Sequence, residues 1–443
     1  MELIKRTLAA GSFLLVVAVA SGQVSPSVVQ LQDYCRNNRP PGYSPRFSQL
    51  TLTPGGNLHY LFPFYYAFKD EAKFRKIYPD GEYEEKLSQF FAFAGDYRTA
   101  LRYQVATYDS IDDATRRKIF RAVDGLKDIV HADARRYIHF RARTSRVIMI
   151  NEARDKPLHR AFTLSLLADL YHEGFRYLAM DLLDNSPSRD LSSLNVRSGY
   201  YCAEPVAGEL VRAALALGYT LVSYEDTAAY RHTPTERDSI QALNLWNVIR
   251  RDTGARMLVH AGYAHISKRR APDGYIPMGL AFRNLSGLDP LTIDQTDMTE
   301  ESNFGYGRVF YQAYVQKYPL TSASIPMIGD EPVNVTNSDL YDLAIIHPPT
   351  QYQDGRPSWL SLGGLRQPVY VKPTVPNSFL VQAYYLAEIE GHDGKPWHVV
   401  PADQTYTATS KRNFLLYLKK GKYTLYFRDM DYRILSSLNI DVD

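Results

Sequence analysis

Titratable side chains recur at the ends of short apolar runs in the middle of the chain. They are Glu152, Asp181, Glu225 and His265, and His159 stands a few residues after the first of them. A neutral imidazole beside carboxylates can act as a general base toward water, or it can bind a metal ion. We expect His159 in the first turn of a helix, where the helix dipole favours a neutral ring. The five residues therefore form a candidate catalytic set.

A plainer interpretation exists for each of these residues. Taken singly, each is better explained as a helix cap or as one half of a salt bridge at a strand end. The functional interpretation gains weight because all five are expected at one edge of a sheet. In open α/β sheets the carboxyl ends of the strands are where ligands bind.

The apolar runs predict the strands of that sheet. Residues 147–150 form an uninterrupted apolar run that is typical of a strand buried on both faces. Strands are predicted at 147–150, 177–182, 220–225 and 257–263, with a later one at 342–347. Helices are predicted between them at 157–173, 208–217 and 235–253, the first capped by Asp155. This alternation predicts an α/β fold with a mostly parallel sheet and flanking helices.

Polar residues also open the long helix at 235–253. Arg237, Gln241 and Asn244 lie at spacings that place them on nearly one face. Such a stripe can reach the same sheet edge, and a solvated helix face explains it equally well.

The remaining chain divides into three further parts. Residues 1–22 have a basic start, a short apolar run and small residues near a cut site, which predicts a signal peptide and an exported protein. Residues 23–143 are expected to be a loop-rich lead-in and a helical subdomain, in which 95–103 resembles a tetratricopeptide-like hairpin. The α/β domain is expected at 144–365. Residues 366–443 are β-rich and predict a small β-sandwich, with a hairpin turn at 419–422 joining its last strands.

Composition narrows the function classes. The net charge is +3 and charges of both signs are interleaved, so we expect no nucleic-acid partner. No apolar run after the signal peptide is long enough to span a membrane. Cys35 and Cys202 could form one disulfide or remain two buried thiols, and no CxxC pattern indicates a zinc site. The sequence also lacks GxSxG, HExxH and P-loop patterns.

The motifs around the candidate residues resemble those of one superfamily. The segment Asn151-Glu152-Ala153-Arg154, followed by Pro157, His159 and Arg160, is similar to the GExH…PxHR signature of the superfamily that includes erythromycin esterases, haem-binding iron-regulated lipoproteins and TraB/Tiki-type proteins. Arg237-Asp238 with Gln241 and Asn244 resembles its "RD..MA.N" helix, and 262–265 resembles its second GxxH motif. The resemblance covers about residues 145–300. It implies a hydrolytic or ligand-binding site that includes Glu152, His159, Asp181 and His265, to which the strand-end pattern adds Glu225. Arg154, Arg160 and Arg237 are the candidates for binding the substrate.

This chain departs from the family pattern at three positions. Asn151 replaces the motif glycine, Asp181 replaces the usual glutamate, and Arg154 replaces the first-motif histidine. A guanidinium can be neither base nor metal ligand at neutral pH. Arg154 could bind a substrate carboxylate or phosphate, or it could pair with Glu152 or Asp181 and silence the site.

Two functions follow as hypotheses. The first is an exported hydrolase that acts on a small-molecule or peptide substrate, an ester, peptide or lactone, in a cleft lined by histidine and carboxylates. The second is a catalytically silent protein that binds a haem, a glycan or another protein at the same place. A divalent metal or a haem could serve as cofactor, and the sequence indicates neither firmly.

Overall fold

The computed structural model describes residues 25–39, 57–79, 81–105, 111–186, 190–302, 307–336, 339–407 and 413–443. The predicted signal peptide at 1–22 lies outside these residues. Among them, no helix combines the length and the apolar character that a membrane span requires.

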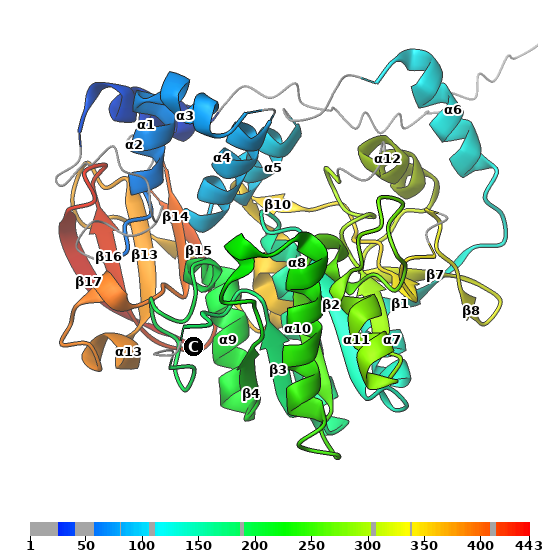
Figure 1. The fold of residues 1–443 in the computed structure, drawn as a ribbon. Helices are drawn as coiled ribbons and strands as arrows, with labels where there is room; N and C mark the ends of the chain where they lie inside the picture. The colour runs from blue at the N-terminus through cyan, green and yellow to red at the C-terminus, as the bar shows by residue number, and fades with distance from the viewer. Residues whose placement is uncertain are drawn as a thin grey trace, which may run out of the picture.

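A six-stranded parallel sheet forms the centre of the molecule (Figure 1). Its order is β4-β3-β5-β2-β6-β9. The strands are β2 (Val147–Glu152), β3 (Tyr177–Met180), β4 (Thr220–Ser223), β5 (Met257–Gly262), β6 (Leu291–Asp294) and β9 (Leu343–Ala344). The predicted α/β fold with a parallel sheet is thus confirmed, including the distant strand, which pairs with β6 at one edge.

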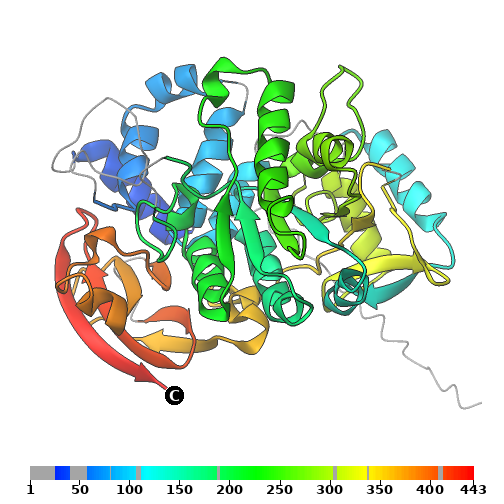
Figure 2. The same ribbon diagram turned by 60° about the horizontal axis from the view of Figure 1, so that its bottom comes forward.

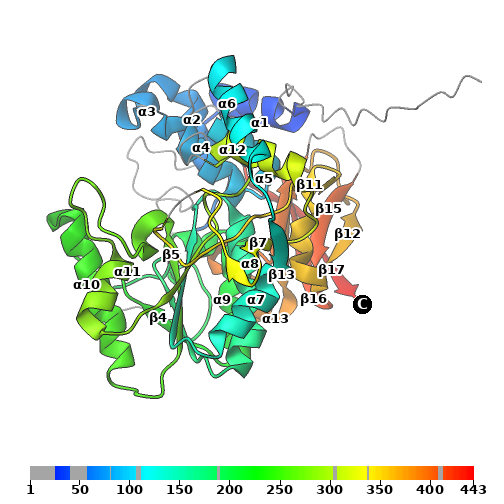
Figure 3. The same cartoon turned by 90° about the vertical axis from the view of Figure 1, so that its right-hand side faces the viewer.

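Helices cover both faces of this sheet (Figure 3). One face carries α7 (Ala134–Ala142), α8 (Pro157–His172) and α9 (Pro205–Leu217), and the other carries α10 (Pro234–Ile249) and α11 (Met278–Ser286). Because side chains alternate along a strand, Ile148 and Ile150 pack under α8 and α9, while Val147 and Met149 pack under α10 and α11. Glu152 continues the series of Ile148 and Ile150, which turns its carboxylate toward α8.

The start of α8 differs from the prediction. Its N-cap is Lys156, which makes no side-chain capping bond. The Asp155 carboxylate instead accepts a hydrogen bond of 3.1 Å from the Ser88 hydroxyl. The predicted Asp155 cap is therefore wrong, because the Asp155 side chain makes a tertiary hydrogen bond instead of capping the helix.

The N-terminal part contains α1 (Pro26–Asn37), α2 (Phe62–Lys69), α3 (Glu71–Ile77), α4 (Glu82–Phe93), α5 (Tyr97–Val105) and α6 (Asp113–Asp124). The first five share a core with α8, α9 and the C-terminal strands, whereas α6 packs on the helix at 307–317. Phe64, Phe90, Leu210 and Phe379 belong to one continuous core. This part also contains a strand, β1 (Val130–Asp133), which pairs with β7 (Ser324–Ile328). Its partner lies so far along the chain that no local pattern predicts it.

Short elements complete the α/β part and its connection to the C-terminal strands. They are α12 (Gly307–Lys317), β8 (Glu331–Pro332), β10 (Tyr352–Gln353) and β11 (Arg356–Pro357). The three-stranded sheet β1-β7-β8 and the C-terminal strands lie at opposite ends of the parallel sheet (Figure 2).

The C-terminal part consists of two antiparallel sheets on a common core. One has the order β14-β13-β16-β17 and the other pairs β12 with β15. The elements are β12 (Gln367–Val371), β13 (Leu380–Tyr385), α13 (Leu386–Glu390), β14 (Asp403–Tyr406), β15 (Phe414–Leu418), β16 (Gly421–Arg428) and β17 (Ile434–Val442). Val381 and Leu425 of the first sheet pack with Leu416 of the second, as the predicted small β-sandwich requires.

The predicted hairpin at 419–422 is wrong. It was expected to pair 414–418 with 423–427, but β15 pairs with β12, whereas β16 pairs with β13 and β17. The turn carries the chain from one sheet of the sandwich to the other. Turn residues between two β-rich runs do not distinguish a hairpin from such a crossing.

Both cysteines are free and fully buried, which settles the alternative that the sequence left open. Burial raises the pKa of both thiols, that of Cys202 to about 12. They act as small apolar core residues.

Candidate functional site

The carboxyl edge of the sheet holds a buried network beside partly exposed groups. Glu152 is the last residue of β2, and Asp181 directly follows β3. Glu225 follows β4, and His265 lies in the short 3₁₀ turn after β5. The strand-end positions of the four residues agree with the prediction, and their surroundings differ sharply.

Glu152 belongs to a fully buried network beneath the edge. The Arg160 guanidinium donates to both carboxylate oxygens, from Nε at 2.7 Å and from Nη2 at 3.0 Å. His260 lies 2.9 Å from Glu152 through Nε2, and Arg160 Nη1 donates to Glu204 at 3.1 Å. Glu204 in turn caps α9, accepting from the amides of its first turn. None of these four side chains has any exposed surface.

In this network two carboxyl groups share one guanidinium. Burial alone raises the pKa of Glu152, but the charge of Arg160 and the contact with His260 outweigh it and hold that pKa well below its usual range. Burial dominates at Glu204, whose pKa is raised. Because Glu152 and Arg160 are enclosed and already paired, they anchor β2 to α8 and α9, and they offer no surface to a substrate.

His159 is likewise enclosed. Its Nδ1 accepts a 2.9 Å hydrogen bond from the Ala153 amide, and its ring stacks on His347. Burial lowers its pKa well below the usual value, so the ring is neutral. In a neutral ring whose Nδ1 accepts, Nε2 carries the proton and has no lone pair for a base. The neutral state is as predicted, although burial is its largest cause rather than the helix dipole.

Asp181 pairs with the residue that replaces the motif histidine. Arg154 Nη2 donates to Asp181 Oδ2 at 2.9 Å, and the Gly262 amide donates to the same oxygen at 2.9 Å. The Arg154 guanidinium also lies over the Tyr201 ring, 4.6 Å from its centroid. A β-carbon at position 262 would stand 3.2 Å from Arg154 Nη2, so the glycine makes room for this pair. Of the pairings considered for Arg154, the one with Asp181 is present.

Glu225 and Arg237 form a second pair at this edge. Arg237 holds the Glu225 carboxylate with Nε and Nη2, and Gln241 donates to it at 2.9 Å. Although burial alone raises the pKa of Glu225, the bonds from Arg237 and Gln241 lower it overall. The predicted face of α10 thus points to the sheet edge, with Arg237 about one quarter exposed.

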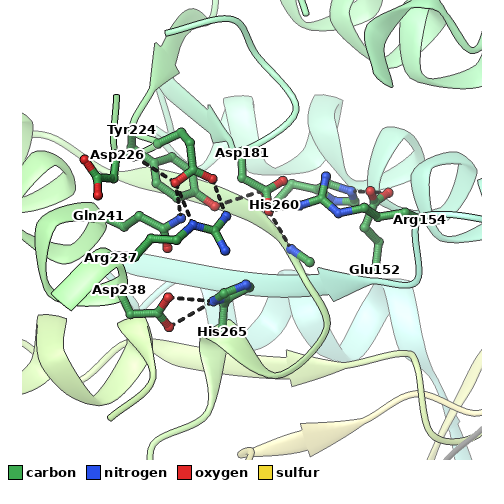
Figure 4. Close-up of polar contacts among 12 residues, drawn as sticks. Glu152, Arg154, Asp181, Tyr224, Asp226, Arg237, Asp238, Gln241, His260 and His265 are labelled. Carbon is green, nitrogen blue, oxygen red and sulfur yellow. Dashed lines mark hydrogen bonds and ion pairs between the residues drawn. The ribbon is translucent and has the colours of Figure 1, made fainter. Parts of the chain in front are cut away.

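His265 forms a dyad with a buried carboxylate. Its Nδ1 lies 2.9 Å from both oxygens of Asp238, which is fully buried (Figure 4). Asp238 also accepts from the Tyr275 hydroxyl and from the Met278 amide. The His265 side chain keeps 20% of its surface exposed, and Nε2 takes no part in these bonds. An Nδ1 proton held by a carboxylate leaves the Nε2 lone pair free, as a general base requires.

The turn that presents His265 is strained. Tyr263 has a φ of +42°, in the left-handed region that costs a bulky residue about 1–2 kcal/mol. This turn connects Gly262, which supports Asp181, to His265, which faces Asp238. Strain of this kind persists where the surrounding contacts hold it, and it clusters at functional sites.

Sequence reasoning missed several members of these groups as site residues, among them His260, Asp238 and Tyr275. His260 sits inside a strand and looks like a core residue, Asp238 was noted only as a motif position, and Tyr275 lies in a loop. Of these, only Asp238 had a usable signal, since it belongs to the helix motif that the resemblance highlighted.

In Figure 4 the Asp181 side chain lies between those of Arg237 and Arg154, with His265 and Asp238 on the other side of Arg237.

The described residues contain no group of three or more His, Cys, Asp or Glu side chains arranged to hold a metal ion. The position where the resemblance expects a histidine carries Arg154, which donates to Asp181. The side chains at this position therefore do not fit a metal ion.

Comparisons with known proteins add little. No family model matches the chain, and no curated protein matches it. Among solved structures, the type III effector HopBA1 is similar at 12% sequence identity with a TM-score of 0.31, over 50% of this chain and 96% of that one.

Proposed function

We propose that this protein is an exported hydrolase that acts on an ester, lactone or peptide bond, with His265 as general base. The observation that carries the proposal is the Asp238–His265 dyad, whose Nε2 is not engaged by the dyad contacts. The amino-terminal sequence pattern supports export, and the motif resemblance to erythromycin esterases and Tiki-type proteins supports the reaction class.

The proposed reaction uses the side chains as follows. His265 Nε2 removes a proton from a water molecule as its oxygen attacks the acyl carbon. Arg237, whose Nη1 takes no part in the Glu225 pair, stabilises the oxyanion. The imidazolium then returns the proton to the leaving oxygen or nitrogen, so that water is consumed and an acid and an alcohol or amine are released. Asp238 orients the ring and stabilises its charged form.

Hydrolysis of three probes tests this proposal: p-nitrophenyl butyrate, dihydrocoumarin and leucine p-nitroanilide. At least one should be turned over. In folded Asp238→Asn, kcat should fall, because an amide cannot stabilise the imidazolium that forms when His265 accepts a proton. Lack of turnover of all three by folded protein would count against the proposal.

One observation favours the alternative of a silent binding protein. The Arg154–Asp181 pair occupies two positions to which the resemblance assigns chemistry, and it engages Asp181 Oδ2 with the Arg154 guanidinium. A haem titration followed in the Soret region tests one version of this alternative. An unshifted band would remove haem from the possible ligands.

A further inference from the structure

A second candidate site lies between α5, the start of α8 and the loops at 299–300 and 350–359. A cavity of about 20 Å³ opens there. That volume holds one or two groups of the size of a water molecule. The walls include Tyr97, Trp359, Tyr352, Asp155 and Glu300. None of these residues belongs to the His265 dyad or to the pairs at Asp181 and Glu225.

Aromatic rings form the apolar walls. The rings of Tyr97 and Trp359 meet at a centroid distance of 5.0 Å and an angle of 54°, making a corner. Trp359 and Tyr352 are each half-buried, so the walls reach the protein surface. Faces of aromatic rings attract cations and alkyl stems.

Asp155 belongs to the polar wall, and one of its carboxylate oxygens has no hydrogen-bond partner. Asp155 is 1% exposed, and its Oδ2 accepts from Ser88, whereas its Oδ1 has no hydrogen bond. A buried acceptor left unpaired costs about 1–3 kcal/mol, so a donor bound there would be stabilising. Glu300 adds a second carboxylate, held by the Thr350 amide at 3.0 Å.

The cation that lines the cavity is engaged elsewhere. It is Lys156, and its ammonium donates to the backbone oxygen of Glu301 at 2.8 Å. Burial raises the pKa of Asp155 and of Glu300, and lowers that of Lys156 to about 8. The charge of Lys156 lowers the pKa of both carboxyl groups, and burial outweighs it.

We propose that this pocket binds the primary ammonium end of an organic amine. The ammonium group has the size of a water molecule and donates to Asp155 Oδ1 and to Glu300. The first carbon of the alkyl stem lies against Tyr97, and the rest of the stem passes Tyr352 and Trp359 toward the surface. The site is independent of the proposed hydrolase chemistry, because it shares no side chain with the His265 dyad.

Three probes with the same four-carbon stem test the proposal on the full chain: n-butylammonium chloride, sodium butyrate and n-butanol. Ligand-observed NMR titration measures the Kd of each. We expect butylammonium to bind at least about tenfold more tightly than the other two, which corresponds to about 1.4 kcal/mol. Tighter binding of butyrate would overturn the proposal, since Lys156 and the α8 N-terminus would then recognise an anion. Equal binding of butanol would reduce the site to an apolar pocket and would overturn it as well.

Variants locate the binding. Glu300→Gln should weaken butylammonium binding severalfold, and Lys156→Met should tighten it by removing a like charge. Glu331→Gln removes an exposed carboxylate outside the pocket and serves as the matched control. Unchanged affinity in folded Glu300→Gln would contradict the proposal. His265→Asn should bind butylammonium as the wild type does, so a failure of the hydrolase proposal leaves this one standing.

Discussion

Two groups at the same edge of the sheet contain the same residue types and differ in what they leave free. In the buried network, Glu152 is satisfied by Arg160 and His260, and both nitrogens of His260 are engaged. In the dyad, Asp238 satisfies one nitrogen of His265, and the ring remains partly exposed. A carboxylate–histidine contact at a strand end is therefore an anchor in one place and a candidate base in the other.

The two groups differ in accessibility because their residues lie on different faces of the sheet and at different distances past the strand ends. Glu152 follows the alternation that points Ile148 and Ile150 toward α8, so its carboxylate ends beneath a helix. His265 lies three residues beyond the end of β5, in a strained turn that lifts it out of the sheet. Position after a strand predicts the edge, and only the face and the distance from the strand end decide access.

The largest effect on stability is expected from a substitution that breaks the buried network. Arg160→Met leaves Glu152 and Glu204 as buried carboxylates without a cation. We expect the free energy of unfolding to fall by about 3–5 kcal/mol, measured by urea denaturation. Arg135→Met removes the exposed pair with Asp169 and should cost less than about 1 kcal/mol. Similar losses in both variants would show that the buried network is not a stability anchor.

The second prediction concerns the pH dependence of stability. Arg160 contacts two carboxylates, whereas Lys156, also buried, contacts a backbone oxygen. The pKa of Lys156 is lowered to about 8, whereas an unfolded lysine titrates near about 10.4. Between these values the unfolded chain binds more protons, so stability rises with pH, by at most about 3 kcal/mol. Below pH 8 both states are protonated and this gain is absent.

Lys156→Met serves as the reference for that measurement, because other groups titrate in the same range. The difference in unfolding free energy between wild type and variant should change between pH 8 and 10 in favour of the wild type. A constant difference over this range would mean that Lys156 is not desolvated as described.

A smaller loss of stability is expected from a substitution at Gly262, which lies against the Arg154–Asp181 pair. Gly262→Ala places a methyl group 3.2 Å from Arg154 Nη2, and the guanidinium must shift. We expect a loss of about 1 kcal/mol in stability, because the far end of an arginine moves easily. Gly254→Ala, where the nearest neighbour is an aspartate oxygen at 3.5 Å, is the control. An equal effect in both would remove close approach as the reason for a glycine at 262.

The sequence predicted the strands and the edge well, because long apolar runs alternating with helical patterns carry that information locally. Glu225 and Arg237 were assigned separate roles, yet they form one pair, since pairing depends on which strand lies under α10. The sequence did not indicate His260 as a site residue. Its neighbours depend on the register between β3 and β5, which sets Met180 beside His260, and one strand's sequence does not reveal that register. The hairpin at 419–422 failed for the same reason, as sheet membership is a tertiary property.

A matched pair of substitutions tests the central claim most directly. His265→Asn keeps a donor for Asp238 and removes the base nitrogen, and His159→Asn keeps an acceptor for the Ala153 amide. With whichever of the three probes the wild type hydrolyses, kcat should fall by about 10²–10⁴ in His265→Asn, the usual contribution of a general base. Folded His159→Asn should retain kcat within about threefold of the wild type, less than about 0.7 kcal/mol of barrier. Full activity in His265→Asn, or an equal loss in His159→Asn, would contradict the assignment of His265 as the base.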